Sequence, residues 1–221
     1  MERRFTANAV AGVRLTARAE GQPEGLSGYA AVFYDGTPGT EYRLYDDMVE
    51  RIMPGAFDKA LSERQDVRGL FNHDANQVLG RTSAGTMRLG IDAKGLTYDI
   101  DPGNTTVAKD VSEHVRRKDV TGSSFSFIPL EASWIEETKE GRTTWIREIR
   151  SVQLYDVGPV TFPAYEATTA GVRSRDDAAD ARKSLDAFRF ERQQQNNQIT
   201  GRLAQYAARS AEVMAIAESI D

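Results

Sequence analysis

Alternating hydrophobic and polar positions recur through the first three quarters of the chain. Several segments combine this alternation with many β-branched and aromatic residues, which is typical of β-strands. They are residues 26–33 (LSGYAAVF), 86–93 (TMRLGIDA), 95–101 (GLTYDID), 123–137 (SSFSFIPLEASWIEE) and 143–157 (TTWIREIRSVQLYDV). The second and third segments predict a hairpin, because Ala93-Lys94-Gly95 forms a turn between two alternating runs.

Two segments have the pattern of helices. Residues 55–64 (GAFDKALSER) follow Pro54, and residues 104–119 (NTTVAKDVSEHVRRKD) begin with Asn104 as a candidate cap and end in a basic turn that suits the helix dipole. Short strands with two interposed helices predict an α+β fold. We expect a mainly antiparallel β-barrel with surrounding helices, because a doubly wound sheet would alternate strands and helices regularly.

The composition divides the chain near residue 173. All seven prolines and every one of the 18 glycines except Gly201 lie before that point. The sequence therefore predicts a folded domain at 1–173 and a separate tail at 174–221. In the tail, residues 174–184 (SRDDAADARKS) resemble a charged linker and residues 193–198 (QQQNNQ) are polar and of low complexity.

Beyond this polar stretch, hydrophobic and small residues recur at spacings of four and three. This spacing predicts one stripe along an amphipathic helix. Two interpretations are equally open: the helix docks on its own domain, or it binds a partner. The stripe consists of Ile199, Leu203, Tyr206, Ser210, Val213, Ala217 and Ile220.

The residue inventory excludes several classes of function. The chain has no cysteine and only two histidines, His73 and His114, which argues against disulfides, a transition-metal site and a cysteine nucleophile. No phosphate-binding glycine loop is present, and we expect no cofactor and no metal. A net charge of −5 without a Lys/Arg-rich run argues against nucleic acid as the main partner. No apolar run is long enough to span a membrane, and a secretory signal is not recognisable.

One serine-rich segment suggests nucleophilic chemistry. Residues 122–126 (GSSFS) are one residue away from the GxSxG elbow of α/β-hydrolases, but that fold needs a histidine after the serine and none follows His114. A serine nucleophile would therefore need its base upstream. We favour His73, in the turn-like segment FNHD, over His114, which lies in a charged helix, because loops carry function more often than helix surfaces do.

The same segment has a simpler interpretation. In a strand, Phe125 and Phe127 point to one face and Ser124 and Ser126 to the other, so the rings would lie in the core with the hydroxyls directed outward. The pattern alone favours this simpler interpretation, a half-buried edge strand with solvated serines. Ser123 and Ser126 also remain rivals of Ser124 as the nucleophile.

Several motifs from about Gly28 to Ala170 nevertheless occur together in a characteristic order. They are GYAAVF, VERIMPGAFDKAL, FNHDANQVLGRT, LGIDAKGLTYDID, DVTGSSFSF and VQLYDVGPVTFPAYEAT. In this order the chain resembles the prohead proteases of tailed bacteriophages, which are relatives of the herpesvirus assemblins. The resemblance implies an assemblin-like barrel and a serine endopeptidase activity.

The resemblance also implies roles for individual residues. His73 corresponds to the general base, Ser124 to the nucleophile and Asp156, where the family often has glutamate, to the third member of the triad. The sequence departs from the family at Ser126, where glycine is common. Assemblins use a second histidine as the third member, and this chain has none after His114. Arg81, in LGRT, receives no role.

The implied function is cleavage of the scaffold protein, or of the scaffold-like part of the capsid protein, during prohead maturation. The implied partners are therefore capsid and scaffold proteins, with self-association and self-cleavage in addition, and neither nucleic acid nor a membrane. The implied location is the assembling prohead in the host bacterial cytoplasm. One alternative is a non-catalytic scaffold- or capsid-binding module of the same fold, and another is a small-molecule esterase that uses the same triad.

Overall fold

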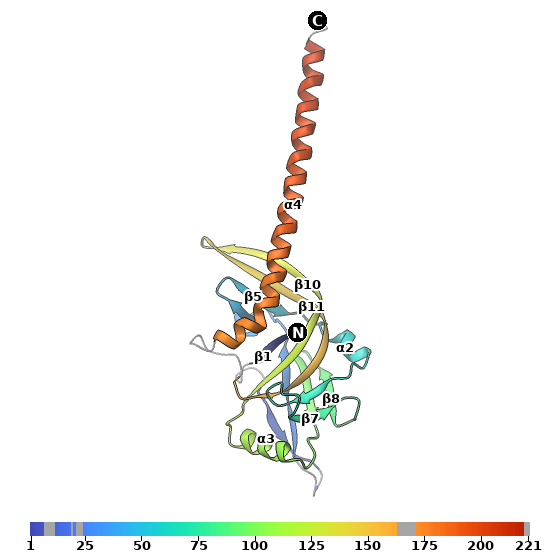
Figure 1. The fold of residues 1–221 in the computed structure, drawn as a ribbon, viewed down its shortest axis with the longest axis vertical. Helices are drawn as coiled ribbons and strands as arrows, with labels where there is room; N and C mark the ends of the chain where they lie inside the picture. Colours follow the sequence, from blue (N-terminus) through green and yellow to red (C-terminus); the bar gives the residue numbers. More distant parts are fainter. Residues whose placement is uncertain (7–11, 19, 21–23, 163–170, 219–221) are drawn as a thin grey trace. The chain divides into compact units, whose positions relative to one another are not determined.

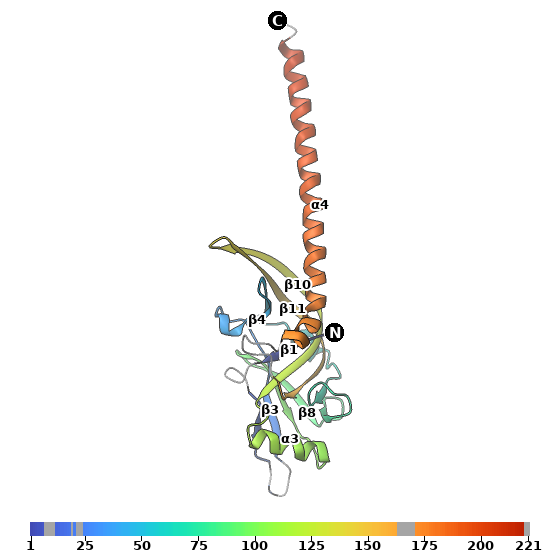
Figure 2. The same cartoon turned by 60° about the vertical axis from the view of Figure 1, so that its left-hand side comes forward.

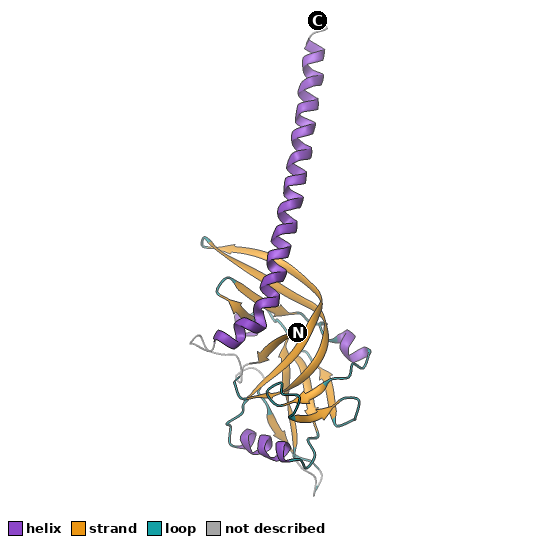
Figure 3. Cartoon of the chain, viewed as in Figure 1, coloured by secondary structure: helices purple, strands orange, loops and turns teal. Residues whose placement is uncertain are grey.

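The computed structural model describes residues 1–6, 12–18, 20, 24–162 and 171–218. The chain separates into two compact units, Met1–Ala178 and Ala179–Asp221. Strands dominate the first unit and one long helix forms the second (Figure 3). No helix within the described ranges has the length and apolar character needed to cross a membrane.

The strands form two sheets (Figure 1). The larger follows the order β1-β10-β11-β5-β4, with β6 paired to β11 and β7 paired to β6, and the smaller follows β2-β3-β9-β8. Their bounds are β1 Glu2–Thr6, β2 Arg14–Thr16, β3 Gly25–Val32, β4 Tyr42–Tyr45, β5 Met48–Ile52, β6 Arg68–Leu70, β7 Val78–Arg81, β8 Met87–Ile91, β9 Gly95–Ile100, β10 Gly122–Lys139 and β11 Arg142–Val160.

The expectation of an α+β fold made mainly of strands is confirmed, but a closed barrel is not. The strands of the described residues form separate sheets of seven and four strands. The strands are also not all short or antiparallel. β10 and β11 form a hairpin of 18 and 19 residues that curves along the domain (Figures 1 and 2). β11 pairs in parallel with β5 at one part of its length and with β6 at another.

Helices and turns follow the sequence pattern with small differences. The predicted hairpin is present as β8 and β9. The helix predicted at 55–64 is present only as the shorter helix α2 (Asp58–Ser62). The helix predicted at 104–119 is α3 (Thr106–Arg116). The cap of α3 is Thr105 rather than the expected Asn104, because the Thr105 hydroxyl accepts a hydrogen bond from the Ala108 amide at 3.1 Å. A 3-10 helix, η1, spans Pro38–Thr40.

An aromatic cluster in the core supports the first half of β10. The rings of Phe125 and Phe127 stack with centroids 5.1 Å apart, and Phe57 meets Phe125 edge to face at 5.6 Å. All three rings have no exposed surface. Burying aromatic rings is strongly favourable, so these contacts fix the register and orientation of β10.

The tail forms one helix, α4 (Gly171–Glu218), so the segment 174–184 that resembles a linker is helical. The tail side chains of Ile199, Leu203 and Tyr206 are 56%, 63% and 67% exposed, and Ser210 is exposed as well. Ile220 lies outside the described residues, as does the PAYEAT end (163–168) of the last motif. The first part of the stripe is therefore an uncovered hydrophobic surface.

Candidate active site

The first residues of β10 alternate between two buried environments. Phe125 and Phe127 point into the core, as the alternation predicts, and Ser124 and Ser126 point to the other face. The expectation that the hydroxyls are directed into solvent is wrong, because Ser123, Ser124 and Ser126 all have no exposed surface. A solvated edge strand is therefore excluded as the explanation of this segment.

Adjacent strands bring the predicted site residues together. Ser124 on β10 lies opposite Gly158 on β11, and Ser126 lies opposite Asp156. At the same level β11 pairs in parallel with β6, with Asp156 opposite Arg68. Since the FNHD segment follows β6 directly, its turn delivers His73 to the face that carries Ser124 and Asp156.

The turn that carries His73 has an unusual backbone. Asn72 and His73 have φ angles of 54° and 57°, in the left-handed region that non-glycine residues seldom occupy. The Asn72 amide donates to the Pro159 carbonyl at 3.1 Å, and its side chain exchanges hydrogen bonds with Thr161 at 2.8 and 3.0 Å. These contacts to the end of β11 hold the turn in a conformation that would otherwise be unfavourable.

Asp74 stabilises the same turn from its other side. Its carboxylate accepts hydrogen bonds from the Asn76 amide and side chain at 2.8 and 3.0 Å. These bonds favour the ionised form and lower the pKa of Asp74. Asp74 therefore stabilises the loop.

The three side chains of the predicted triad are in hydrogen-bond contact. His73 Nε2 lies 2.5 Å from Ser124 Oγ, and His73 Nδ1 lies 2.5 Å from Asp156 Oδ1. The side chains of His73 and Asp156 are only 4% and 7% exposed. In this order the carboxylate can hold the imidazole with Nδ1 protonated, so that Nε2 is free to take the serine proton.

The rival serines have other partners. The Ser123 hydroxyl contacts the Tyr98 hydroxyl at 2.8 Å, and burial raises the pKa of Tyr98, which keeps that phenol neutral. The Ser126 hydroxyl donates to Asp156 Oδ2. Ser126 therefore gives Asp156 a second hydrogen bond that orients the carboxylate. The family that the sequence resembles commonly has glycine at this position.

The two remaining candidates lie apart from this site. His114 is on α3, with its side chain 48% exposed and Nδ1 3.7 Å from Asp119. Arg81 forms an ion pair with Asp66 on the surface, and its hydrogen bonds lower the pKa of that carboxyl group. The structure therefore brings together His73, Ser124 and Asp156, and neither His114 nor Arg81 joins them.

Two features of the site are not among the residues proposed from the sequence. Gly158 has no side chain where β6 approaches most closely, and a Cβ there would lie 2.0 Å from the Leu70 carbonyl oxygen. The second feature is β1, whose Arg4 carbonyl oxygen accepts a hydrogen bond from Ser124 at 2.9 Å. A glycine in a strand pattern is a signal of close backbone approach, whereas nothing in the sequence marks residues 2–6 as part of the site.

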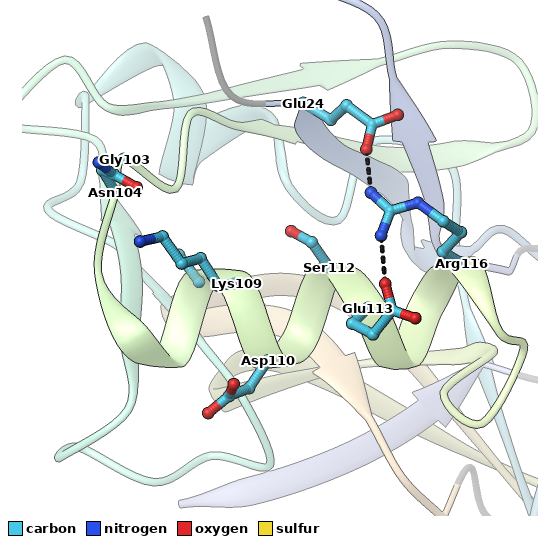
Figure 4. Close-up of a pocket in the computed structure, with 9 residues that line it drawn as sticks. Glu24, Gly103, Asn104, Lys109, Asp110, Ser112, Glu113 and Arg116 are labelled. Atoms are coloured by element: carbon cyan, nitrogen blue, oxygen red, sulfur yellow. Dashed lines mark hydrogen bonds and ion pairs between the residues drawn. The ribbon is translucent and has the colours of Figure 1, made fainter.

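A surface pocket lies beside α3 (Figure 4). It is lined by Glu24, Gly103, Asn104, Ala108, Lys109, Asp110, Ser112, Glu113 and Arg116, and Arg116 bridges Glu24 and Glu113 across it. None of the triad residues lines this pocket. Within the described ranges, no group of three or more His, Cys, Asp or Glu residues is placed to hold a metal ion.

A buried Ser-His-Asp constellation is the arrangement by which serine hydrolases activate a serine hydroxyl. Comparison with known families then identifies the chain more closely. The Caudovirus prohead serine protease family matches residues 13–182, well over half of the sequence, and the chain belongs to that family. It is accordingly a hydrolase of the serine protease type, from a bacteriophage family of capsid maturation. Comparison with curated proteins and with solved structures gave no significant match.

Proposed function

We propose that this chain is the endopeptidase that cuts the scaffold protein, or the scaffold-like part of the capsid protein, during prohead maturation. The observation that carries the proposal is the continuous contact from Asp156 through His73 to Ser124 in a member of the prohead serine protease family. A base with an orienting carboxylate is what a serine hydroxyl needs to become a nucleophile at neutral pH. The implied location is the assembling prohead inside the host cell.

The geometry supports a two-step acyl transfer. Ser124 Oγ forms a bond to the carbonyl carbon of the scissile peptide while its proton passes to His73 Nε2, and Asp156 stabilises the resulting imidazolium. His73 then gives the proton to the leaving amine as the C–N bond breaks, which leaves an ester on Ser124. Water attacks this ester, its proton passes to His73, and the acid product departs with Ser124 regenerated.

A fluorophosphonate probe tests the enzymatic part of the proposal. The probe forms a covalent bond only with an activated serine, so we expect the wild-type chain to be labelled and Ser124→Ala to remain unlabelled. Ser123→Ala, which changes the neighbouring hydroxyl, is the matched control and should retain labelling. A well-folded wild-type chain that is never labelled would instead support the non-catalytic assembly module.

The substrate needs a separate experiment. Wild-type protein and Ser124→Ala are each incubated with the cognate capsid and scaffold proteins, and the products are measured by intact mass. We expect truncated capsid or scaffold protein with the wild type only. Unchanged masses with a chain that is labelled by the probe would show that this serine hydrolase has other substrates, as the esterase alternative requires.

We further propose that the tail beyond residue 173 delivers the protease to its partner and is removed by self-cleavage. The uncovered side chains of Phe190, Ile199, Leu203 and Tyr206 on α4 support a partner-binding role, because exposed hydrophobic residues that recur along one helix are typical of a docking surface. Tethering through such a helix raises the local concentration of the protease at the scaffold. Loss of the tail after assembly would then end that attachment.

A further inference from the structure

β1 occupies the edge of β10 beside the candidate nucleophile. The two strands pair in antiparallel register, with Arg4 opposite Phe125 and Phe5 opposite Ser124. The Arg4 carbonyl oxygen lies 2.9 Å from Ser124 Oγ, and Ser124 has no exposed surface. An extended peptide that presents a carbonyl group to Ser124 along this edge would therefore need the place that β1 fills.

The contact between β1 and Ser124 competes with catalysis. The serine hydroxyl has one proton, and both the Arg4 carbonyl and His73 Nε2 lie within hydrogen-bond distance of Oγ. A proton donated to the carbonyl is not transferred to the imidazole. An arrangement in which Ser124 donates to the Arg4 carbonyl is therefore not the reactive one, and β1 lies where a peptide strand would pair with β10.

Two side chains of β1, those of Glu2 and Arg4, belong to a cluster of buried charges. Strand alternation places Glu2 and Arg4 on one face, with Arg3 on the other. Arg4 donates to the two Glu50 oxygens at 2.6 and 3.0 Å, and Glu2 accepts from Arg147 Nη1 at 2.7 and 3.0 Å.

The other two members of this charged cluster are Glu50 and Arg147. Glu50 on β5 and Arg147 on β11 are register partners, and they form an ion pair at 3.1 Å. Glu50 is completely buried and Arg147 is 3% exposed. The Phe127 ring adds an aromatic wall, with its centroid 5.4 Å from the Arg4 guanidinium carbon.

We propose that a peptide substrate pairs with β10 in place of β1, and that Glu50 and Arg147 select a substrate with arginine at the Arg4 position and an acidic residue two positions before it. This inference rests on the proposed protease function and names its substrate class. The strand pairing supplies affinity that does not depend on sequence, as in other cases of strand addition to a sheet edge. The charged cluster supplies the specificity.

The selectivity follows from the cost of burying charges. When β1 leaves, Glu50 and Arg147 lose the partners that Arg4 and Glu2 provide. A substrate strand with the acid-x-Arg pattern restores both pairs, whereas a neutral strand leaves the buried Glu50 carboxylate and Arg147 guanidinium without these partners. Loss of one partner from a buried, hydrogen-bonded pair typically weakens binding by roughly 30-fold or more.

The test uses peptides, so that the fold of the enzyme is not disturbed. The parent peptide has the sequence of residues 1–8 (MERRFTAN), one variant carries Arg4→Gln, and a matched control carries Arg3→Gln. We expect cleavage after Arg4 in the parent peptide, roughly a 30-fold or greater loss of kcat/KM for the Arg4→Gln peptide, and little change for the control. In a Glu50→Gln enzyme the difference between the parent and Arg4→Gln peptides should shrink to a few-fold.

Changes in the protein itself test the displacement of β1. Arg4→Gln in the full chain should raise kcat/KM for the parent peptide because β1 is held less firmly, and Arg3→Gln should not. Probe labelling of Ser124 without any preference between the Arg4→Gln and Arg3→Gln peptides would overturn this inference and leave the protease function standing. Labelling without cleavage of the parent peptide would also overturn it. Absence of both labelling and cleavage would overturn the inference together with the function.

Discussion

Replacement of Asp156 by asparagine probes the contact that orients the imidazole. The Asp156 carboxylate accepts from His73 Nδ1 at 2.5 Å and from the Ser126 hydroxyl. His73 and Ser126 contact different carboxylate oxygens, and asparagine has an NH2 group in place of one of them, so it cannot accept at both positions. If its NH2 group faces His73, the ring must carry its proton on Nε2, and Ser124 then has no base. If its oxygen faces His73, the negative charge that stabilises the imidazolium is still lost.

Both arrangements of the amide predict a large loss of rate. A triad carboxylate replaced by its amide costs about 10⁴ in turnover, which corresponds to roughly 5.4 kcal/mol at 1.36 kcal/mol per tenfold. Because asparagine has nearly the same shape, the fold should be preserved. We therefore expect Asp156→Asn to be folded and to react with a fluorophosphonate probe, and with a peptide substrate, about 10⁴ times more slowly than the wild type.

Asp74→Asn is the matched control for this experiment. It makes the same chemical change next to His73, but the retained oxygen can still accept from the Asn76 amide that Asp74 now caps at 2.8 Å. We expect its labelling rate to stay within a few-fold of wild type. A folded Asp156→Asn variant with wild-type rates, or an equal loss in both variants, would refute the assignment of the third role to Asp156. Ser126→Ala should give an intermediate loss, since it removes only one bond from that carboxylate.

The remaining predictions concern the catalytic pair, the strand contact and the tail. His73→Ala and Ser124→Ala should each remove nearly all turnover, and the double variant should be scarcely slower, because the two residues act as a unit. Independent losses of rate that multiply in the double variant would contradict the pairing. His114→Ala, the control, should stay near the wild-type rate. Gly158→Ala should lower the free energy of unfolding by about 1–3 kcal/mol or more, since the added Cβ would overlap the β6 backbone. Gly39→Ala is the control and should change thermal stability little, because a Cβ at Gly39 would have no neighbouring atom within 4 Å. Purified wild-type protein should slowly lose a C-terminal fragment by mass spectrometry while Ser124→Ala keeps its full length; identical trimming of both would assign the cut to another protease.

Local sequence information determined the elements that carry the site. The alternation at Phe125 and Phe127 predicts a strand with its rings in the core, and the turn at Ala93-Lys94-Gly95 predicts the β8–β9 hairpin; both depend on side chains only a few residues apart. The ordered motifs also pointed to His73, Ser124 and Asp156 by resemblance to a family.

Only the tertiary structure decided how those residues meet and what surrounds them. The contact between Asp156 and His73 depends on β6 pairing in parallel with β11, a pairing between segments far apart in the chain. The burial of Ser124 and the arrangement of the strands in two sheets also depend on contacts between segments far apart in the chain. The alternation of a strand specifies which residues share a face, but it does not specify which other segment will cover that face. The place of β1 beside Ser124, and the pairing of Arg4 with Glu50, follow from that long-range choice.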